Sequence, residues 1–412
     1  MMGQREGKSR KQMIRLFVFE VVFVAILCIS AYFISLSHKI GYEKLDDDIY
    51  VANYGDNGQE GADLDGEEKL DFTVFSASIE NEESADSSFF VNEGVLEVGA
   101  LGYGENISKY RNILLVGVDA RDQSVMTRGA NADVMMIVSI NKESGEIRLV
   151  SVLRDTLLRL FDGGVYYPDR LYDKANAQNC YTGISDTVSM LNMNLDLNIR
   201  EYAVVNWAAA AEIVDTIGGI EMNIENEEIL SYLNGYLTEV NQETGLFAPQ
   251  LKETGVQMLT GTQAVSFCRI RYAGLEDSGR TNNQREVIVK ILDKMKQLLF
   301  EKPALVMTAV NQAAQSVVTN LTLKEIGALA FDAVDFQIAG HCSFPFQYQP
   351  GDSSGRIGEL TGGVTDFLVA TDLETNVKQL HQFLYGDAAS SYVPSDYVKA
   401  ISEDIRWMAG DN

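Results

Sequence analysis

Four arginines lie close together in residues 268–286, CRIRYAGLEDSGRTNNQRE, of a chain whose formal net charge is −26. They are Arg269, Arg271, Arg280 and Arg285. Guanidinium groups match the geometry of phosphate oxygens, and an acidic chain needs a local basic pocket to hold an anion. This density therefore indicates a site for a phosphate-rich ligand. The alternative is that these arginines form surface ion pairs with their sequence neighbours Glu276, Asp277 and Glu286.

The spacing of these residues suggests how such a pocket could be built. Arg280 follows the turn AGLEDSG and precedes a predicted helix, 281–300, whose first turn contains Gln284. A helix N-terminus adds free N–H groups and a partial positive charge. Arg269 and Arg271 are about 200° apart on the helix predicted for 260–272, so a frayed helix end or extended backbone would have to bring them together.

Charged residues also stand where three short apolar runs end. NILLVGVD (112–119) closes with Asp119, ADVMMIVSIN (132–141) opens at Asp133, and EIRLVSVLRD (146–155) closes with Arg154 and Asp155. Apolar runs joined by turn signals predict adjacent strands. If the strands are antiparallel, these three ends meet at one rim of a sheet.

Asp119 and Asp133 at such a rim could hold a metal ion. Mg²⁺ takes one or two protein carboxylates and completes its shell with water and substrate phosphates. Metal and arginines together suit a pyrophosphate, whose charge must be neutralised as a phosphoryl oxygen leaves. The alternative is that both aspartates cap turns at strand ends.

The remaining patterns predict a layered α/β domain, because strands and amphipathic helices alternate. EYAVVNW and IEMNI are strand-like, and the chain after Lys302 looks helical through about Val334 and then loop-rich. Further helices are predicted at 185–195, opened by Ser185, at 208–219, closed by glycine, and around Leu373–Leu384.

Composition excludes several classes of protein. The chain is 46% hydrophobic, which is enough for a large core. Its pI of about 4.5 argues against a nucleic-acid partner, which would require a basic face. The four cysteines and three histidines show no metal-binding spacing, so zinc, thiol or imidazole chemistry is not indicated.

The N-terminal residues indicate a membrane protein. Residues 1–15 form a basic tail, and the apolar run 16–36 is about 31 Å long as a helix, enough to cross a bilayer. The basic flank predicts a cytoplasmic N-terminus and a single-pass protein with its folded part outside. A cleaved signal peptide is the alternative, but its apolar region is normally shorter. The acidic, glycine-rich residues 37–109 are predicted to be an extracytoplasmic stalk.

Seven ordered blocks of this sequence resemble a known family. They are NILLVGVDAR, NADVMMIVSIN, VSVLRDTLL, DKANAQ, VDTIGGIEM, LTGTQAVSFCRIRY and SGRTNNQRE. In order and spacing they are similar to the LytR-CpsA-Psr family of membrane-anchored, extracytoplasmic proteins of mainly Gram-positive bacteria. The resemblance covers residues 110–335 and leaves 336–412 as an extension that either stands apart or completes the same domain.

The resemblance implies a phosphotransferase that moves a glycopolymer, such as teichoic acid or capsule, from a polyprenyl-pyrophosphate carrier to peptidoglycan, with Mg²⁺ or Mn²⁺. It implies a layered α-β-α domain with a central mixed sheet flanked by helices and a channel for the prenyl chain. Asp119 and Asp133 resemble the family's metal-site aspartates. The residues that resemble its pyrophosphate-binding set are Arg121, Arg154, Arg269, Arg271, Arg280 and Gln284.

The sequence departs from the family pattern at two positions. Asn131 stands where the second block usually has arginine, and Arg128 could compensate from the loop before it. Leu153 stands where proline usually precedes Arg154. Catalytic roles are expected for Asp119, Asp133 and Arg154, with either aspartate a candidate base. The alternative functions are a non-catalytic binder of lipid-linked glycan and a polyprenyl-pyrophosphate hydrolase.

Overall fold

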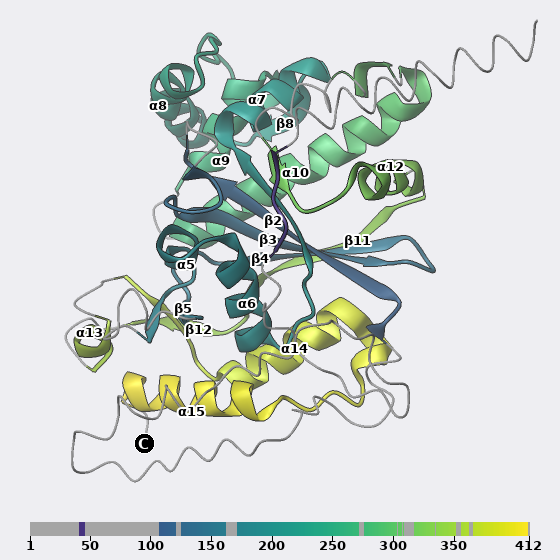
Figure 1. Cartoon of the computed structure of the whole chain (residues 1–412). Helices are drawn as coiled ribbons and strands as arrows, with labels where there is room; N and C mark the ends of the chain where they lie inside the picture. The colour runs from purple at the N-terminus through teal and green to yellow at the C-terminus, as the bar shows by residue number, and fades with distance from the viewer. Residues whose placement is uncertain are drawn as a thin grey trace, which may run out of the picture.

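The computed structural model describes eleven ranges of the chain (Figure 1). The ranges are 41–45, 107–120, 125–161, 171–271, 276–302, 304–306, 308, 317–333, 335–351, 356–361 and 366–410. The predicted tail 1–15, the predicted membrane segment 16–36, most of the predicted stalk and Arg121 lie outside them. Within the described ranges, no helix is both long and apolar enough to span a bilayer.

A seven-stranded mixed sheet forms the centre of the molecule, in the order β1-β10-β7-β2-β3-β4-β11. The bounds of its strands are Gly41–Tyr42 (β1), Tyr110–Val118 (β2), Ala132–Asn141 (β3), Glu146–Val152 (β4), Glu201–Asn206 (β7), Val317–Thr319 (β10) and Gln337–Phe344 (β11). β2, β3 and β4 pair antiparallel in sequence order, which confirms the predicted rim where β2 and β4 end and β3 begins.

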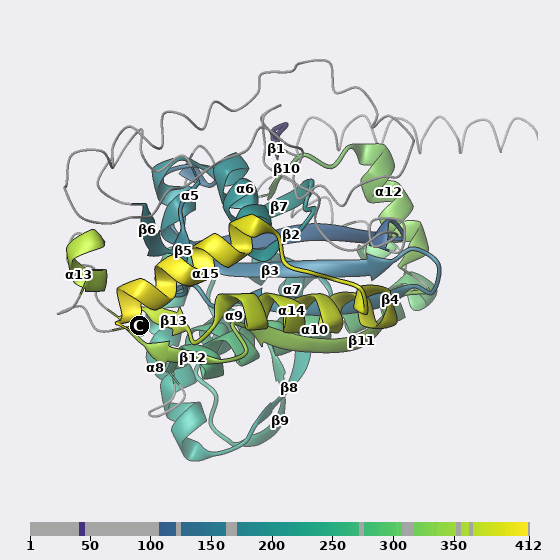
Figure 2. The ribbon, with the colours of Figure 1, turned by 90° about the horizontal axis from the view of Figure 1, so that it is seen from below.

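Both faces of the sheet are covered by helices, as the mixed α/β prediction requires. Alternate residues of β2 show this: Leu114 and Val116 belong to the main core, and Ile113 packs in a second cluster on the other face. The main core lies against α6 (Ile184–Leu195), α14 (Leu373–Tyr385) and α15 (Asp396–Ala409), and Figure 2 shows α14 and α15 crossing that face. The second cluster packs against α10 (Glu276–Glu301) and α12 (Leu323–Asp332).

A lobe of helices and a two-stranded sheet stands beyond one end of the central sheet (Figure 1). It begins directly after β7, because Asn206 ends that strand and also caps the next helix by accepting a hydrogen bond from Ala209. Its elements are α7 (Trp207–Thr216), β8 (Ile220–Ile224), α8 (Glu227–Thr244), β9 (Gly255–Leu259) and α9 (Gly261–Arg269). They share a core of their own with one side of α10.

The C-terminal residues complete this domain. β11 pairs with β4 in the central sheet, and α14 and α15 cover the main core. Asp196, which follows α6, accepts hydrogen bonds from the hydroxyls of Tyr392 and Ser395 at 2.6 Å each. The smaller elements are β5 (Leu157–Arg159), β6 (Tyr172–Lys174), α5 (Ala177–Tyr181), β12 (Tyr348–Pro350), α13 (Arg356–Leu360), β13 (Leu368–Ala370) and a short 3-10 helix (Gly386–Ala389).

The structure corrects three local predictions. The stretch from Lys302 to Val334 is not continuously helical, because Val317–Thr319 pairs as β10 with β7. The predicted stalk is not a spacer along its whole length, because Gly41–Tyr42 forms β1. The helix predicted to be opened by Ser185 is preceded by Gly183, whose φ of 112° suits glycine.

Candidate functional site

Asp133 is placed at the predicted rim by an irregularity in the sheet. Gly117 pairs with Val134 but the next residue, Val118, pairs with Ala132, so Asp133 is an extra residue on β3. Such a β-bulge re-aims the side chain of the inserted residue. Asp119 follows Val118 on the neighbouring strand and is exposed. The two predicted metal-site aspartates therefore stand on adjacent strands at the same end of the sheet.

Arg154 links the end of β4 to Asp133. Its Nη1 donates to Asp133 Oδ1 at 2.7 Å, and its Nε lies 3.3 Å from Asp155 Oδ2. Lys174 Nζ lies 3.1 Å from the other oxygen of Asp155. We call Asp133, Arg154, Asp155 and Lys174 the Arg154 cluster; its two cations and two carboxylates are all largely shielded from solvent.

Backbone hydrogen bonds bring Lys174 to the rim. The N–H groups of Ala175 and Asn176 donate to the carbonyls of Thr156 and Arg154 at 2.9 and 3.1 Å. Sequence reasoning did not assign Lys174 or Asp155 to the site. The available signals were the position of Asp155 next to Arg154 at a strand end and the presence of Lys174 in the DKANAQ block.

Arg269 belongs to a second group, which the lobe provides. Its Nη1 donates to Glu243 at 2.5 Å and its Nη2 to Glu239 at 3.1 Å. Its guanidinium carbon also lies 5.7 Å from the ring centre of Tyr236. We call Arg269, Glu239 and Glu243 the Arg269 cluster. Its carboxylates come from α8, not from the acids near Arg269 in the sequence.

The electrostatics connect Asp119 to the Arg269 cluster. Burial raises the pKa of Glu243, Arg269 opposes that rise, and the negative charge of Asp119 adds to it. Burial disfavours the charge of Arg269, but Glu243 and Glu239, with a smaller contribution from Asp119, raise its pKa above the ordinary value. Asp119 therefore lies within electrostatic range of this cluster, so one end of the sheet carries charged groups from both the sheet and the lobe.

The helix that carries Arg269 is shorter than predicted. α9 begins after a capping box formed by Thr260 and Gln263 and ends at Arg269, and Ile270 has extended backbone geometry and is fully buried. Arg271 therefore follows the helix instead of lying on it, and it is exposed. The helical angle between the two arginines does not apply, because the helix stops between them.

Arg280 and Gln284 lie inside α10, which starts at Glu276, earlier than the predicted 281. Arg280 is therefore not at the helix N-terminus, which corrects that part of the prediction. Both side chains are buried, with exposures of 7% and 5%. Gln284 Nε2 donates to the carbonyl of Cys268 at 3.4 Å, so this turn of α10 is held against the end of α9 that carries Arg269.

Arg128 lies in the segment that precedes β3. Asn179 fixes this segment by donating from Nδ2 to the carbonyls of Met126 and Ala130 at 3.1 and 2.7 Å. The side chain of Arg128 is exposed and its stem lies beside Gly183, where an added Cβ would be 3.5 Å from it. Arg121 falls outside the described residues.

The residues at the rim supply only part of the ligand shell that a hard divalent cation needs. Among the described residues, no three His, Cys, Asp or Glu side chains are grouped so as to hold a metal ion. Asp119 and Asp133 supply two oxygen-donor side chains on adjacent strands, and Mg²⁺ commonly takes that number from a protein that also binds phosphates. The donor chemistry therefore suits Mg²⁺ together with a phosphate ligand.

Comparison with known proteins identifies the family. The sequence model of the LytR_cpsA_psr family matches residues 74–354, more than half of the chain. The chain belongs to the LytR_cpsA_psr family. The match begins and ends outside the predicted domain limits of 110 and 335, and it takes in β11, as expected if the C-terminal strand is part of the fold.

Curated relatives match over part of their length. A polyisoprenyl-teichoic acid–peptidoglycan teichoic acid transferase, TagU, of Halalkalibacterium halodurans is 26% identical over 50% of this chain and 60% of its own. Biofilm regulatory protein A of Streptococcus mutans is 29% identical over 45% of this chain and 44% of its own. The chain thus aligns with about half the length of these relatives.

Solved structures share the fold. A protein of Streptococcus agalactiae superposes with a TM-score of 0.55 and 20% identity, covering 72% of this chain and 93% of that one. A structure of TagT bound to LI-WTA gives a TM-score of 0.51 and 19% identity, covering 69% and 92% of the two chains. These likenesses support the layered fold with a central mixed sheet.

Proposed function

We propose that this protein is an extracytoplasmic phosphotransferase that moves a glycopolymer from a polyprenyl-pyrophosphate carrier to peptidoglycan. Family membership supports this reaction class, as do relatives named teichoic acid transferases. The structural observation that carries the proposal is the Arg154 cluster, where Arg154 and Lys174 meet two aspartates at the rim of the sheet. The structure of TagT with bound LI-WTA agrees with the same class.

The Arg154 cluster can bind and orient a pyrophosphate. Arg154 and Lys174 supply charge-assisted donors, and further donors are proposed to come from Arg269 on α9, Arg271 after it, and Arg280 and Gln284 on α10. Arg269 uses two of its five N–H groups on Glu239 and Glu243. Those carboxylates hold the guanidinium in one orientation, so less side-chain entropy is lost when an anion binds.

In the proposed reaction a hydroxyl oxygen of peptidoglycan attacks the phosphorus next to the glycan. A new P–O bond forms, the bond from that phosphorus to the bridging oxygen breaks, and polyprenyl phosphate leaves with the electron pair. The hydroxyl proton goes to a carboxylate oxygen that the metal does not hold, either on Asp119, which is exposed at the rim, or on Asp133. The cationic side chains stabilise the negative charge that develops on the leaving oxygen.

Asp119 and Asp133 are proposed to hold Mg²⁺ or Mn²⁺. When bound, the ion would neutralise charge on the phosphate oxygens. Arg154 fixes the position of Asp133, because its Nη1 lies 2.7 Å from the carboxylate. Arg128, in the segment before β3, would supply the positive charge that is missing at Asn131, where the family pattern has arginine.

The proposed location is the outer face of the membrane of a Gram-positive bacterium, with residues 16–36 as a single anchor. The partners are then the lipid-linked glycan, peptidoglycan and the bilayer. The prenyl chain would be held by apolar side chains of the domain, as the family resemblance implies.

A transfer assay with the full-length protein in liposomes tests the function. The donor is a labelled prenyl-pyrophosphate glycan, and the acceptor is a set of peptidoglycan fragments with Mg²⁺. The expected products are a phosphodiester-linked conjugate and free polyprenyl phosphate. Release of polyprenyl phosphate without conjugate would instead identify a hydrolase, and binding without release would identify a non-catalytic binder.

A further inference from the structure

Residues 41–45 attach the chain to the edge of the central sheet. Gly41 and Tyr42 pair in parallel with Val318 and Thr319 of β10, and the N–H of Glu43 donates to the Thr319 carbonyl at 3.1 Å. Leu45 is 7% exposed and belongs to the main core. This short segment is therefore held by backbone pairing and by burial of an apolar side chain.

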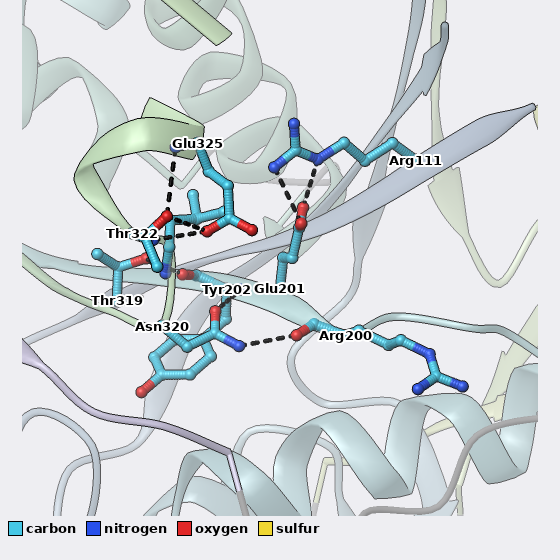
Figure 3. Close-up of polar contacts among 9 residues, drawn as sticks. Arg111, Arg200, Glu201, Tyr202, Thr319, Asn320, Thr322 and Glu325 are labelled. Atoms are coloured by element: carbon cyan, nitrogen blue, oxygen red, sulfur yellow. Dashed lines mark hydrogen bonds and ion pairs between the residues drawn. The ribbon is translucent and has the colours of Figure 1, made fainter. Parts of the chain in front are cut away.

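The neighbouring strands make this attachment firm. The hydroxyl of Tyr202, on β7, donates to the Glu43 carbonyl at 2.7 Å. Figure 3 shows the contacts of Asn320 with the start of β7: it accepts from the Tyr202 N–H at 3.0 Å and donates to the carbonyl of Arg200, which precedes the strand, at 2.7 Å. The Thr319 hydroxyl also donates to the Tyr202 carbonyl. β10 and the segment paired with it are thus tied to an interior strand by side chains as well as by the backbone.

The strand directions fix where the chain reaches the sheet. β1 is parallel to β10, β10 is antiparallel to β7, and β7 is parallel to β2. β1 therefore runs opposite to β2, and Gly41, where β1 begins, lies toward the end of the sheet where β2 stops. That end is the rim that carries Asp119, Asp133 and Arg154.

The strand register shows how far the rim residues lie from β1. A single row of paired residues crosses the sheet, formed by Gly41, Val318, Val204, Val116, Met135 and Val152. Asp119 lies three residues beyond Val116, and Arg154 lies two residues beyond Val152. Both lie on the side of this row from which β1 begins. Three strand spacings, about 14 Å, separate β1 from β2 across the sheet.

The chain between the predicted membrane segment and β1 is short. The five Cα–Cα steps from Leu36 to Gly41 span at most about 18 Å, whereas a spacer running to Tyr110 could extend about 250 Å. Residues 46–106 come after β1, so they connect two strands of the sheet and do not lie between the anchor and the fold.

We propose that residues 41–45 act as a clamp that holds the catalytic rim of the sheet facing the outer leaflet of the bilayer. The pyrophosphate of a lipid carrier is then presented to Asp133 and Arg154 at the height of the lipid headgroups. The inference rests on the membrane anchor of the proposed function, and it replaces a stalk of residues 37–109 with a short tether before β1.

Two matched insertions test the clamp in full-length protein reconstituted in liposomes. A ten-residue Gly-Ser segment is placed after His38, before β1, or after Gly61, beyond β1. Energy transfer from a fluorescent amino acid at position 200 to a lipid-bound acceptor reports the height of the domain. Such a segment adds about 17 Å of flexible chain, so only the insertion after His38 should lower the energy transfer.

The outcomes separate the clamp from the proposed chemistry, because energy transfer needs no turnover. An equal or larger drop for the insertion after Gly61 would overturn the clamp, since residues 46–106 would then set the height. Failure of the wild-type chain to float with the liposomes would overturn it as well. If the clamp holds, the insertion after His38 should slow transfer from a bilayer-embedded donor and spare a short-chain, water-soluble donor, through loss of effective concentration.

Discussion

Arg269 and Arg285 belong to the same arginine-rich stretch but have opposite surroundings. Arg269 donates to two carboxylates, Glu239 and Glu243, at the rim of the sheet. Arg285 is part of α10 and 4% exposed; its side chain lies between that helix and the sheet, where its hydrogen-bond partners are neutral. They are Ser151 at 3.2 Å, Asn282 at 3.3 Å, His341 at 3.0 Å and Ser343 at 2.7 Å.

The difference shows that a dense run of one residue type need not form one pocket. Arg285 points at β4 and β11 and connects a helix to the sheet, so its role is structural. Burial lowers its pKa from the ordinary value, whereas the carboxylates around Arg269 raise the pKa of that residue despite burial. The charge of Arg269 is thus stabilised by carboxylates at the rim, whereas the charge of Arg285 lies among neutral partners between α10 and the sheet.

The largest effect is expected for Arg269→Gln. Removing one guanidinium that stabilises the developing charge should lower transfer by at least about 100-fold, and the protein should still fold. The measurement is the initial rate of conjugate formation beside a thermal unfolding curve.

The double variant Arg269→Gln/Glu243→Gln is the control for that experiment. It removes the nearer of the two carboxylates that Arg269→Gln would leave without their cation, and so removes the repulsion of a phosphate by Glu243. If the double variant regains wild-type rates, the loss came from the unpaired glutamate and Arg269 has no direct role.

Arg285→Ala should lower the stability of the fold. It would leave Ser151 and Ser343 without a donor and open a cavity under α10, at a cost of about 3 kcal/mol in the free energy of unfolding. The exposed Arg200→Ala, the same change of residue type, should cost less than about 0.5 kcal/mol. Urea unfolding measures both, and equal values for the two variants would contradict the structural role of Arg285.

His341 provides a finer test of the neutral surroundings of Arg285. Burial and then the charge of Arg285 lower the pKa of His341 from its ordinary value. Arg285→Gln should therefore raise that pKa, as followed by NMR titration of the imidazole. Because the folded pKa is the lower one, the contribution of His341 to stability is present above about pH 6.5 and is lost as the pH falls. An unchanged titration in the variant would mean that Arg285 does not act on His341.

Among the variants of arginines that pair with carboxylates, the smallest effect is expected for Arg111→Ala. Arg111 donates to both oxygens of Glu201 at 2.6 and 2.9 Å, at the end of the sheet opposite the rim (Figure 3). Both side chains are partly exposed, so the change should cost less than about 1 kcal/mol and leave transfer unaltered. Loss of transfer in this variant would show that pairing with a carboxylate, and not position at the rim, is what marks a functional arginine.

The sequence predicted the parts of the site that local patterns determine. The runs that form β2, β3 and β4 are apolar, β-branched and separated by turn signals, so the meeting of Asp119, Asp133 and Arg154 at one rim followed from strand order. The apolar spacing of α10 also predicted most of that helix.

The missing parts depend on tertiary pairing. β1 is two residues long, and only its partner β10 defines it. Glu239 and Glu243 come from α8, which was not predicted, and they reach Arg269 from 30 and 26 residues away in the chain. Lys174 is brought to Asp155 by the pairing of β6 with β5 and by backbone bonds next to these strands, and strands of three residues are too short to show a periodicity.

The most direct test of the rim as a pyrophosphate site is the affinity of the full-length protein for a short-chain prenyl pyrophosphate, measured by titration calorimetry with Mg²⁺. The neutral double variant Arg154→Gln/Asp133→Asn keeps the net charge of the rim, and Arg111→Ala is the matched control. The account predicts a loss of at least tenfold for the double variant, about 1.4 kcal/mol, and none for the control. Equal affinity in all three proteins would contradict it.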